Sequence, residues 1–185
     1  MRHGWFVIPL VQTGDRTIEE QSLGVEKALA ECEGKTVLDL GCAEGLLSRE
    51  FAHAGAKLVH GVDSVHGHLM VAKDMCASWK NVSFEHMDLN YPRPQRRMYD
   101  IVLALGVCHK LAEPVIGIRY AAAASLDLVL VRMSMQTSDG LLKSKFLPYN
   151  ICNVITEMGK MGFVLEGIEP GPRKETVHYY RRTKK

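Results

Sequence analysis

The sequence predicts an α/β fold: a doubly wound, mostly parallel sheet whose last two strands pair antiparallel. Strand-like segments alternate with segments whose apolar residues recur at helical spacing, which favours parallel strands joined by helical crossovers. Residues 99–107 and 126–133 are nearly unbroken apolar runs, as expected for strands covered on both faces. Only a Pro-Gly-Pro turn separates the final two strand-like segments, so they should form an antiparallel pair.

Seven segments are predicted to be strands because they are rich in β-branched and other apolar residues and are bounded by turn residues. The first ends in a glycine, and the third alternates apolar and polar residues. The predicted strands cover residues 36–41, 57–63, 82–89, 99–107, 126–133, 163–168 and 176–182.

Helices are predicted where apolar residues recur every three or four positions. Thr17 and Glu20 fit a capping box at the start of the helix before the first strand. Residues 90–98, between the third and fourth strands, are too short and proline-rich for a helix, so one crossover helix is missing. The predicted helices span residues 17–32, 47–54, 69–79, 111–125 and 151–158.

Length and composition predict one globular domain over residues 1–185, with residues 1–34 as a leader and helix and residues 35–185 as the core. The chain is 46% hydrophobic and 24% charged, which excludes a disordered or fibrous protein. Its net charge of +2 excludes a polyacidic protein and supports nucleic-acid binding only weakly.

The five cysteines form no CxxC pair, which is typical of the reduced, buried thiols of a cytoplasmic protein. No apolar run approaches the ~18 residues of a membrane span. The apolar stretch of residues 5–11 is short and interrupted by Pro9, so we expect it to belong to the mature protein.

The first predicted strand ends in a glycine-containing loop with the pattern D-x-G-x-A-x-G, from Asp39 to Gly45. The dinucleotide fingerprint GxGxxG is not satisfied, because Leu46 stands at the position of its third glycine. The small residues allow a bulky ligand to lie against the backbone, and the Asp39 carboxylate can pair with a cationic amine. A tight turn needed only for folding is the alternative explanation.

Acidic residues also end the next two strands. Asp63 follows the glycine loop by about 20 residues, where a carboxylate can accept both ribose hydroxyls. Asp88, followed by Leu89, is placed to accept the exocyclic amine of an adenine. Each acid alone fits a helix N-cap. Three acids at consecutive strand ends favour a nucleoside-containing ligand.

These segments resemble the class I S-adenosylmethionine (SAM)-dependent methyltransferases, which share a Rossmann-like fold. The resemblance covers residues 35–134, through the segments TVLDLGCAEG, LVHGVDS, EHMDLN and YDIVLALGV, and the closing strand pair matches by topology. It implies an enzyme that binds SAM, releases S-adenosylhomocysteine (SAH), and methylates a small-molecule or RNA-type nucleophile. The cofactor-binding residues that it implies are Asp39, Gly41, Cys42, Ala43, Gly45, Asp63, Ser64, Val65, Asp88, Leu89 and Leu105.

The methyl acceptor is less well indicated. GVCHKL resembles the G-V-x-H-x-L segment of methyltransferases that act on small molecules and on modified wobble uridines. Within it, His109 is the candidate catalytic residue, as a base for an acceptor hydroxyl, although it could instead cap or pack the following helix. His66 and His68 favour a polar helix cap, and no metal site is predicted. Asp15 or Arg16 of the leader and residues 136–146 are further candidates to shape the site.

Two basic clusters could contact phosphates, which leaves nucleic acid as a possible partner. A non-catalytic SAM-binding subunit that acts with a partner protein is the alternative function. An NAD-dependent enzyme is disfavoured by the missing fingerprint. The basic clusters are Arg93, Arg96 and Arg97 after the third strand, and Arg173, Lys174, Arg181, Arg182, Lys184 and Lys185 near the C-terminus.

Overall fold

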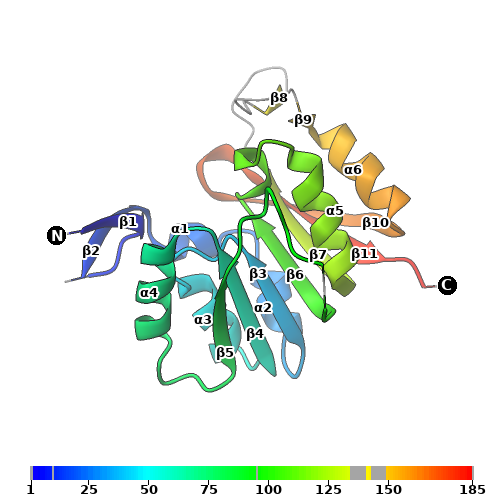
Figure 1. Ribbon diagram of the computed structural model, residues 1–185. Helices are drawn as coiled ribbons and strands as arrows, with labels where there is room; N and C mark the ends of the chain where they lie inside the picture. Colours follow the sequence, from blue (N-terminus) through cyan, green and yellow to red (C-terminus); the bar gives the residue numbers. More distant parts are fainter. Residues whose placement is uncertain (1, 10, 95, 134–140, 143–148, 185) are drawn as a thin grey trace.

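A seven-stranded sheet in the order β10-β11-β7-β6-β3-β4-β5 forms the centre of the structure (Figure 1). The computed structural model describes residues 2–9, 11–94, 96–133, 141–142 and 149–184. Five neighbouring strands, from β7 to β5, run parallel, and β11 is antiparallel to both β7 and β10, which confirms the predicted architecture. The strands are β3 Thr36–Leu40, β4 Leu58–Asp63, β5 Val82–His86, β6 Tyr99–Leu105, β7 Ser125–Met133, β10 Phe163–Pro170 and β11 Thr176–Arg182.

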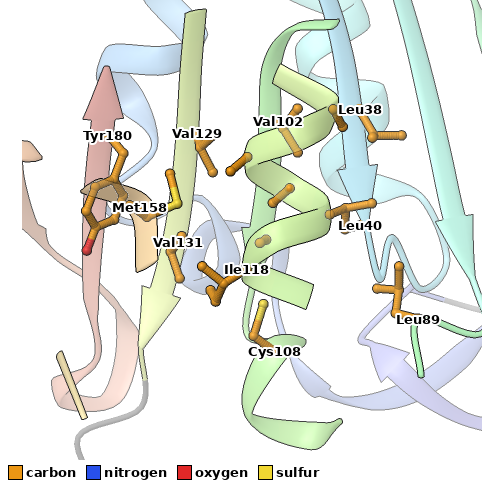
Figure 2. Close-up of a cluster of buried hydrophobic side chains, with 14 of the residues drawn as sticks. Leu38, Leu40, Leu89, Val102, Cys108, Ile118, Val129, Val131, Met158 and Tyr180 are labelled. Carbon is orange, nitrogen blue, oxygen red and sulfur yellow. The ribbon is translucent and has the colours of Figure 1, made fainter. Parts of the chain in front are cut away.

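Helices cover both faces of this sheet. Along β6, Ile101, Leu103 and Leu105 belong to one apolar cluster, and Val102 and Ala104 belong to the cluster on the opposite face. This alternation of two buried faces explains the unbroken apolar run in the sequence. Figure 2 shows the second cluster, in which side chains of β3, β6 and β7 lie near helices α5 and α6. The helices are α1 Ile18–Ser22, α2 Glu26–Glu31, α3 Leu46–His53, α4 His66–Met75, α5 Pro114–Ala124 and α6 Ile151–Lys160, with short 3-10 turns at Cys108–Lys110 and Pro172–Lys174.

The helix predicted over residues 17–32 is divided into α1 and α2, so a single helix was the wrong prediction. Its capping box is present, with Thr17 accepting from the Glu20 amide and Glu20 accepting from the Thr17 amide. Gly24 adopts a φ of +79°, which interrupts the helix. Carbonyl groups at the interruption are satisfied by side chains, since Arg132 donates to the carbonyl oxygens of residues 21 and 23 and Tyr179 to that of residue 24.

The leader contains two short strands that the sequence analysis did not predict, β1 Arg2–Phe6 and β2 Gln12–Arg16, which pair in parallel. A Cβ atom at Gly14 would lie 2.2 Å from the backbone of Phe6, so glycine permits this close approach. Phe6 and Ile8 pack with Leu46 and with the partly buried Val71 of α4, and Figure 1 shows the leader beside α4. A further strand pair, β8 Leu141–Leu142 and β9 Tyr149–Asn150, lies outside the main sheet.

Further details of the structure confirm or refine the sequence predictions. The described residues between β5 and β6 contain no helix, which confirms the missing crossover. Strand β5 ends at His86, so Asp88 lies in the turn beyond it. Cys32, Cys42, Cys76 and Cys108 are buried free thiols, as predicted. No helix in the described part of the chain is long and apolar enough to cross a membrane.

Leu103→Ala should destabilise the fold, because Leu103 is 0% exposed at the centre of β6. We expect the free energy of unfolding to fall by about 2–5 kcal/mol, measured by urea denaturation. The control is Leu126→Ala, at a position that is 48% exposed, which should change it by no more than about 0.5 kcal/mol. Equal losses in the two variants would contradict this placement of the core.

Candidate ligand-binding site at the strand ends

A cleft of about 200 Å³ opens at the carboxyl ends of β3, β4 and β6. In open α/β sheets this edge is the usual ligand site. Most of the predicted cofactor residues line the cleft, and they are Gly41, Ala43, Asp63, Ser64, Val65, Asp88, Leu89 and Leu105. Trp5, His68, Asn90 and Lys110 line it as well and were not predicted.

Three predicted residues do not line the cleft, because their side chains or backbone face the protein interior. Asp39 is 3% exposed and accepts a 2.7 Å hydrogen bond from Ser48 Oγ. The Cys42 thiol is buried and donates to the carbonyl of Ala43. Gly45 starts α3 with a φ of +70°, and a Cβ there would collide with the ring of Phe84.

The glycine loop is held against the neighbouring strand by backbone hydrogen bonds. The amides of Gly41 and Cys42 both donate to the Val62 carbonyl, at 2.8 and 3.0 Å. Gly41 has a φ of +74°, and a Cβ at this position would lie 2.8 Å from the Val107 side chain. Glycine is therefore required at position 41 both for the turn and for the close approach of Val107.

Asp63 lines the cleft and is hydrogen-bonded to the glycine loop. Its Oδ2 accepts from the Ala43 amide at 2.9 Å, and its Oδ1 accepts from the Val65 amide at 2.8 Å. His68 Nδ1 lies 3.6 Å from Oδ1. Burial acts to raise the pKa of Asp63, but the nearby His68 and the hydrogen bonds from the two amides outweigh burial and lower the pKa. Asp63 is therefore an ionised acceptor at neutral pH.

Asp88 is positioned by Asn90, whose amide and side-chain nitrogen both donate to Asp88 Oδ1, at 2.9 and 2.8 Å. The Asn90 side-chain oxygen in turn accepts from the Ala112 amide at 2.8 Å. This short turn fixes a carboxylate beside the apolar Leu89 at one end of the cleft.

The leader contributes Trp5 to the cleft and is anchored by Glu44, which lies in the glycine loop and is 0% exposed. Glu44 accepts from the amides of Trp5 and Phe6, at 2.9 and 3.2 Å, and from Gln12 Nε2 at 3.0 Å. The Trp5 ring also contacts Lys110, and Lys110 Nζ lies 3.8 Å from the centroid of that ring. Glu44 was missed because nothing local in the sequence indicates that its partners come from the leader.

A second cavity of about 160 Å³ adjoins the cleft and shares Trp5, Leu105 and Gly106 with it. His109, the predicted catalytic residue, lines this cavity and not the cleft. Burial, together with Lys110 and Arg16, lowers the pKa of His109, so its imidazole is neutral at neutral pH. The remaining residues lining the cavity are Arg16, Gln21, Arg132 and Glu175.

The basic clusters lie apart from both cavities. Arg93, Arg96 and Arg97 line a separate groove of about 380 Å³, where Arg93 is paired with Glu85 at 2.7 Å. Near the C-terminus, Arg181 pairs with Glu31, Asp127 and Glu166. Arg182 donates to backbone carbonyls. These two C-terminal cations are thus engaged within the protein.

The two histidines at the start of α4 have different partners. His66 stacks on His86, with ring centroids 4.0 Å apart, whereas His68 faces Asp63 and Glu44. Within the described residues, no group of three or more potential metal ligands gathers. Residues 136–140 and 143–146, part of the segment expected to shape the site, lie outside the described residues.

Comparison with known proteins shows what part of this chain is similar to. Residues 37–126, just under half of the chain, match the family model of the methyltransferase domain. Over these residues the chain is similar to the methyltransferase domain. The magnesium protoporphyrin IX methyltransferase of Synechocystis PCC 6803, solved with bound SAH, superimposes with a TM-score of 0.71 at 20% identity, over 92% of this chain and 90% of that chain.

The sequence relatives compared with this chain are named ubiquinone biosynthesis O-methyltransferases. The protein from Ruegeria pomeroyi is 32% identical over 101 residues, which are 54% of this chain and 39% of that protein. The protein from Coxiella burnetii is 32% identical over 92 residues, which are 49% and 39% of the two chains. The [4+2]-cyclase SpnF shares the fold with a TM-score of 0.71 at 13% identity, over 87% of this chain and 81% of that chain. The fold therefore does not by itself specify a reaction.

Asp39→Asn should change how stability depends on pH. Burial is the main cause that raises the pKa of Asp39 from 3.8 to about 6. Between these values the folded protein keeps a proton that the unfolded chain loses, so this group reduces stability as the pH rises from 4 to 7. We expect the free energy of unfolding of the wild type to fall by about 3 kcal/mol relative to Asp39→Asn across that range.

Asp100→Asn is the matched control for this pH series. Burial acts to raise the pKa of Asp100, but hydrogen bonds from the Thr36 amide and hydroxyl outweigh burial and lower the pKa. The wild type should therefore gain stability relative to Asp100→Asn as the pH rises through the acid range. The same slope in both series would contradict the assigned environment of Asp39.

Glu44→Ala should release the leader, because Glu44 accepts the hydrogen bonds that hold Trp5 and Phe6. We expect faster hydrogen exchange at these two amides, with exchange in β6 unchanged. Glu50→Ala is the control, since Glu50 contacts only its neighbour Arg49 among the ion pairs found. Unchanged exchange at Trp5 and Phe6 in Glu44→Ala would show that other contacts hold the leader.

Proposed function

We propose that this protein is a SAM-dependent methyltransferase that transfers a methyl group to an oxygen of a small molecule. The observation that carries the proposal is the cleft itself, where Asp63 and Asp88, at the ends of neighbouring strands, line the same space as Gly41 and Ala43 of the glycine loop. This arrangement offers two separate acceptors to the hydroxyl and amine donors of a nucleoside, and it lacks the fingerprint for a pyrophosphate.

The residues of the cleft fit this cofactor. Asp63, ionised and held by two backbone amides, would accept the ribose hydroxyls. Asp88 and Leu89 would contact the adenine, and the loop at Gly41 would lie along the methionine end. The position of Gly41 in the wall of the cleft supports the last point.

Asp39 would act on the cofactor through its charge, from beneath the glycine loop. Its carboxyl is buried and has a raised pKa of about 6. A cationic ligand near the loop would stabilise the ionised form and lower this pKa. Cofactor binding and ionisation of Asp39 would therefore favour each other.

When bound, the cofactor supplies a methyl group on a positively charged sulfur atom. The protein's own residues need to orient the acceptor toward that methyl group and to exclude water. Trp5, held over the cleft by Glu44 and in contact with Lys110, would restrict water. His109, neutral and next to Gly106, would accept the proton of an acceptor hydroxyl.

The choice of an oxygen acceptor rests on the relatives. Both proteins compared above are named O-methyltransferases of ubiquinone biosynthesis. This chain covers 39% of their length, so the activity of the whole protein and its substrate are part of the proposal. The small volume of the second cavity agrees with a small acceptor.

Calorimetric titration with SAH tests the cofactor assignment. The wild type should bind SAH and should not bind NAD. Asp63→Asn should weaken SAH binding by about tenfold or more, because a charged acceptor for two hydroxyls is lost. Asp100→Asn, which changes a β6 carboxylate that bonds Thr36 away from the cleft, should bind like the wild type.

Binding of NAD in preference to SAH would contradict the proposal. So would equal SAH affinity in the wild type and in Asp63→Asn, since the ribose would then lie elsewhere.

A further inference from the structure

The second cavity contains a buried cation with unused hydrogen-bond donors. Arg132, at the carboxyl end of β7, is 2% exposed. Its Nη2 donates to the carbonyls of Gln21 and Leu23, at 2.5 and 3.1 Å. Its Nε and Nη1 have no hydrogen-bond partner among the described residues. A buried donor without a partner costs folding free energy, so a ligand that accepts from Arg132 would be favoured here.

The nearest carboxylate is already engaged by a second arginine. Glu175 binds Arg16 through both oxygens, at 2.6 and 2.9 Å, and its closest oxygen is 4.0 Å from Arg132 Nε. Asp39 also attracts Arg132 through space, but it bonds Ser48 and does not line the cavity. The cavity wall thus presents two guanidinium groups and one carboxylate. This excess of positive charge favours an anionic ligand.

The position of the cavity indicates which ligand it holds. Gly41, Asp63 and Asp88, which would bind the cofactor, all line the cleft and are absent from the second cavity. The two spaces meet at Leu105 and Gly106. The cavity therefore adjoins the cleft but lacks the residues that would bind the nucleoside. His109 is one of the residues that line it.

We propose that this cavity binds the methyl acceptor and that the acceptor carries a carboxylate, which Arg132 holds. The proposal deepens the proposed function and rests on it. A carboxylate accepts charge-assisted hydrogen bonds from guanidinium in the geometry that arginine provides. The volume of about 160 Å³ corresponds to several water molecules at ~30 Å³ each, and it suits a small organic acid.

Binding of small carboxylates to SAH-saturated protein tests this proposal. Acetate and benzoate are titrated by calorimetry beside acetamide and benzamide, which have nearly the same shape without the charge. The wild type should bind at least one acid more tightly than its amide. Arg132→Gln should weaken that binding by about tenfold or more. The matched control is Arg119→Gln, because Arg119 is exposed, pairs with Glu157 and does not line the cavity.

The proposal is overturned if neither acid binds better than its amide, or if Arg132→Gln binds the acids as well as the wild type does. It is also overturned if Arg132→Gln weakens SAH but not 5′-methylthioadenosine, which lacks the amino-acid end. Arg132 would then hold the cofactor's own carboxylate. The comparison of acids with amides uses only the wild type. It therefore still tests the proposal if Arg132→Gln fails to fold. If SAH does not bind, the proposed function fails, and the same comparison in the free protein still tests the anion site.

Discussion

The glycine loop contains one buried carboxylate, Glu44, and contacts a second, partly buried one, Asp63, and much of the site depends on how these charges are satisfied. Glu44 is 0% exposed and takes its hydrogen bonds from the leader. Asp63 takes one of its hydrogen bonds from the loop itself. A buried carboxylate without such partners would be strongly destabilising. The leader, the loop and β4 are therefore held together by the same requirement, and the cleft forms at the point where they meet.

A second buried ion cluster joins the end of the chain to its beginning. Glu175 lies just before β11, Arg16 ends β2, and Arg132 lies on β7, which is paired with β11. Arg132 also satisfies the carbonyls where α1 and α2 separate. The antiparallel strand pair thus does more than extend the sheet, because it delivers an acidic residue that fixes the position of the leader.

The sequence was sufficient for the sheet and for the acids of the cleft, since both follow from local patterns at strand ends. It was not sufficient for the second cavity, whose polar residues are separated by up to 159 positions along the chain. In the sequence, Arg132 is simply a polar residue near the end of an apolar strand. Only the pairing of β7 with β11 brings it near Glu175. For Asp39 the motif identified the residue but not its position. Its hydrogen bond from Ser48 holds the carboxylate beneath the loop and away from the cleft wall.

Charge is divided between the two spaces in a way that suits the proposed reaction. The cleft has Asp63 and Asp88 against the single lysine Lys110 on its walls, whereas the adjoining cavity presents Arg16 and Arg132 against the single carboxylate of Glu175. A cationic methyl donor would be stabilised on one side of Leu105 and Gly106, and an anionic acceptor on the other. Fixed charges of this kind orient reactants without reorganising during the reaction. Because donor and acceptor carry opposite charge, binding either one would favour the other across this boundary.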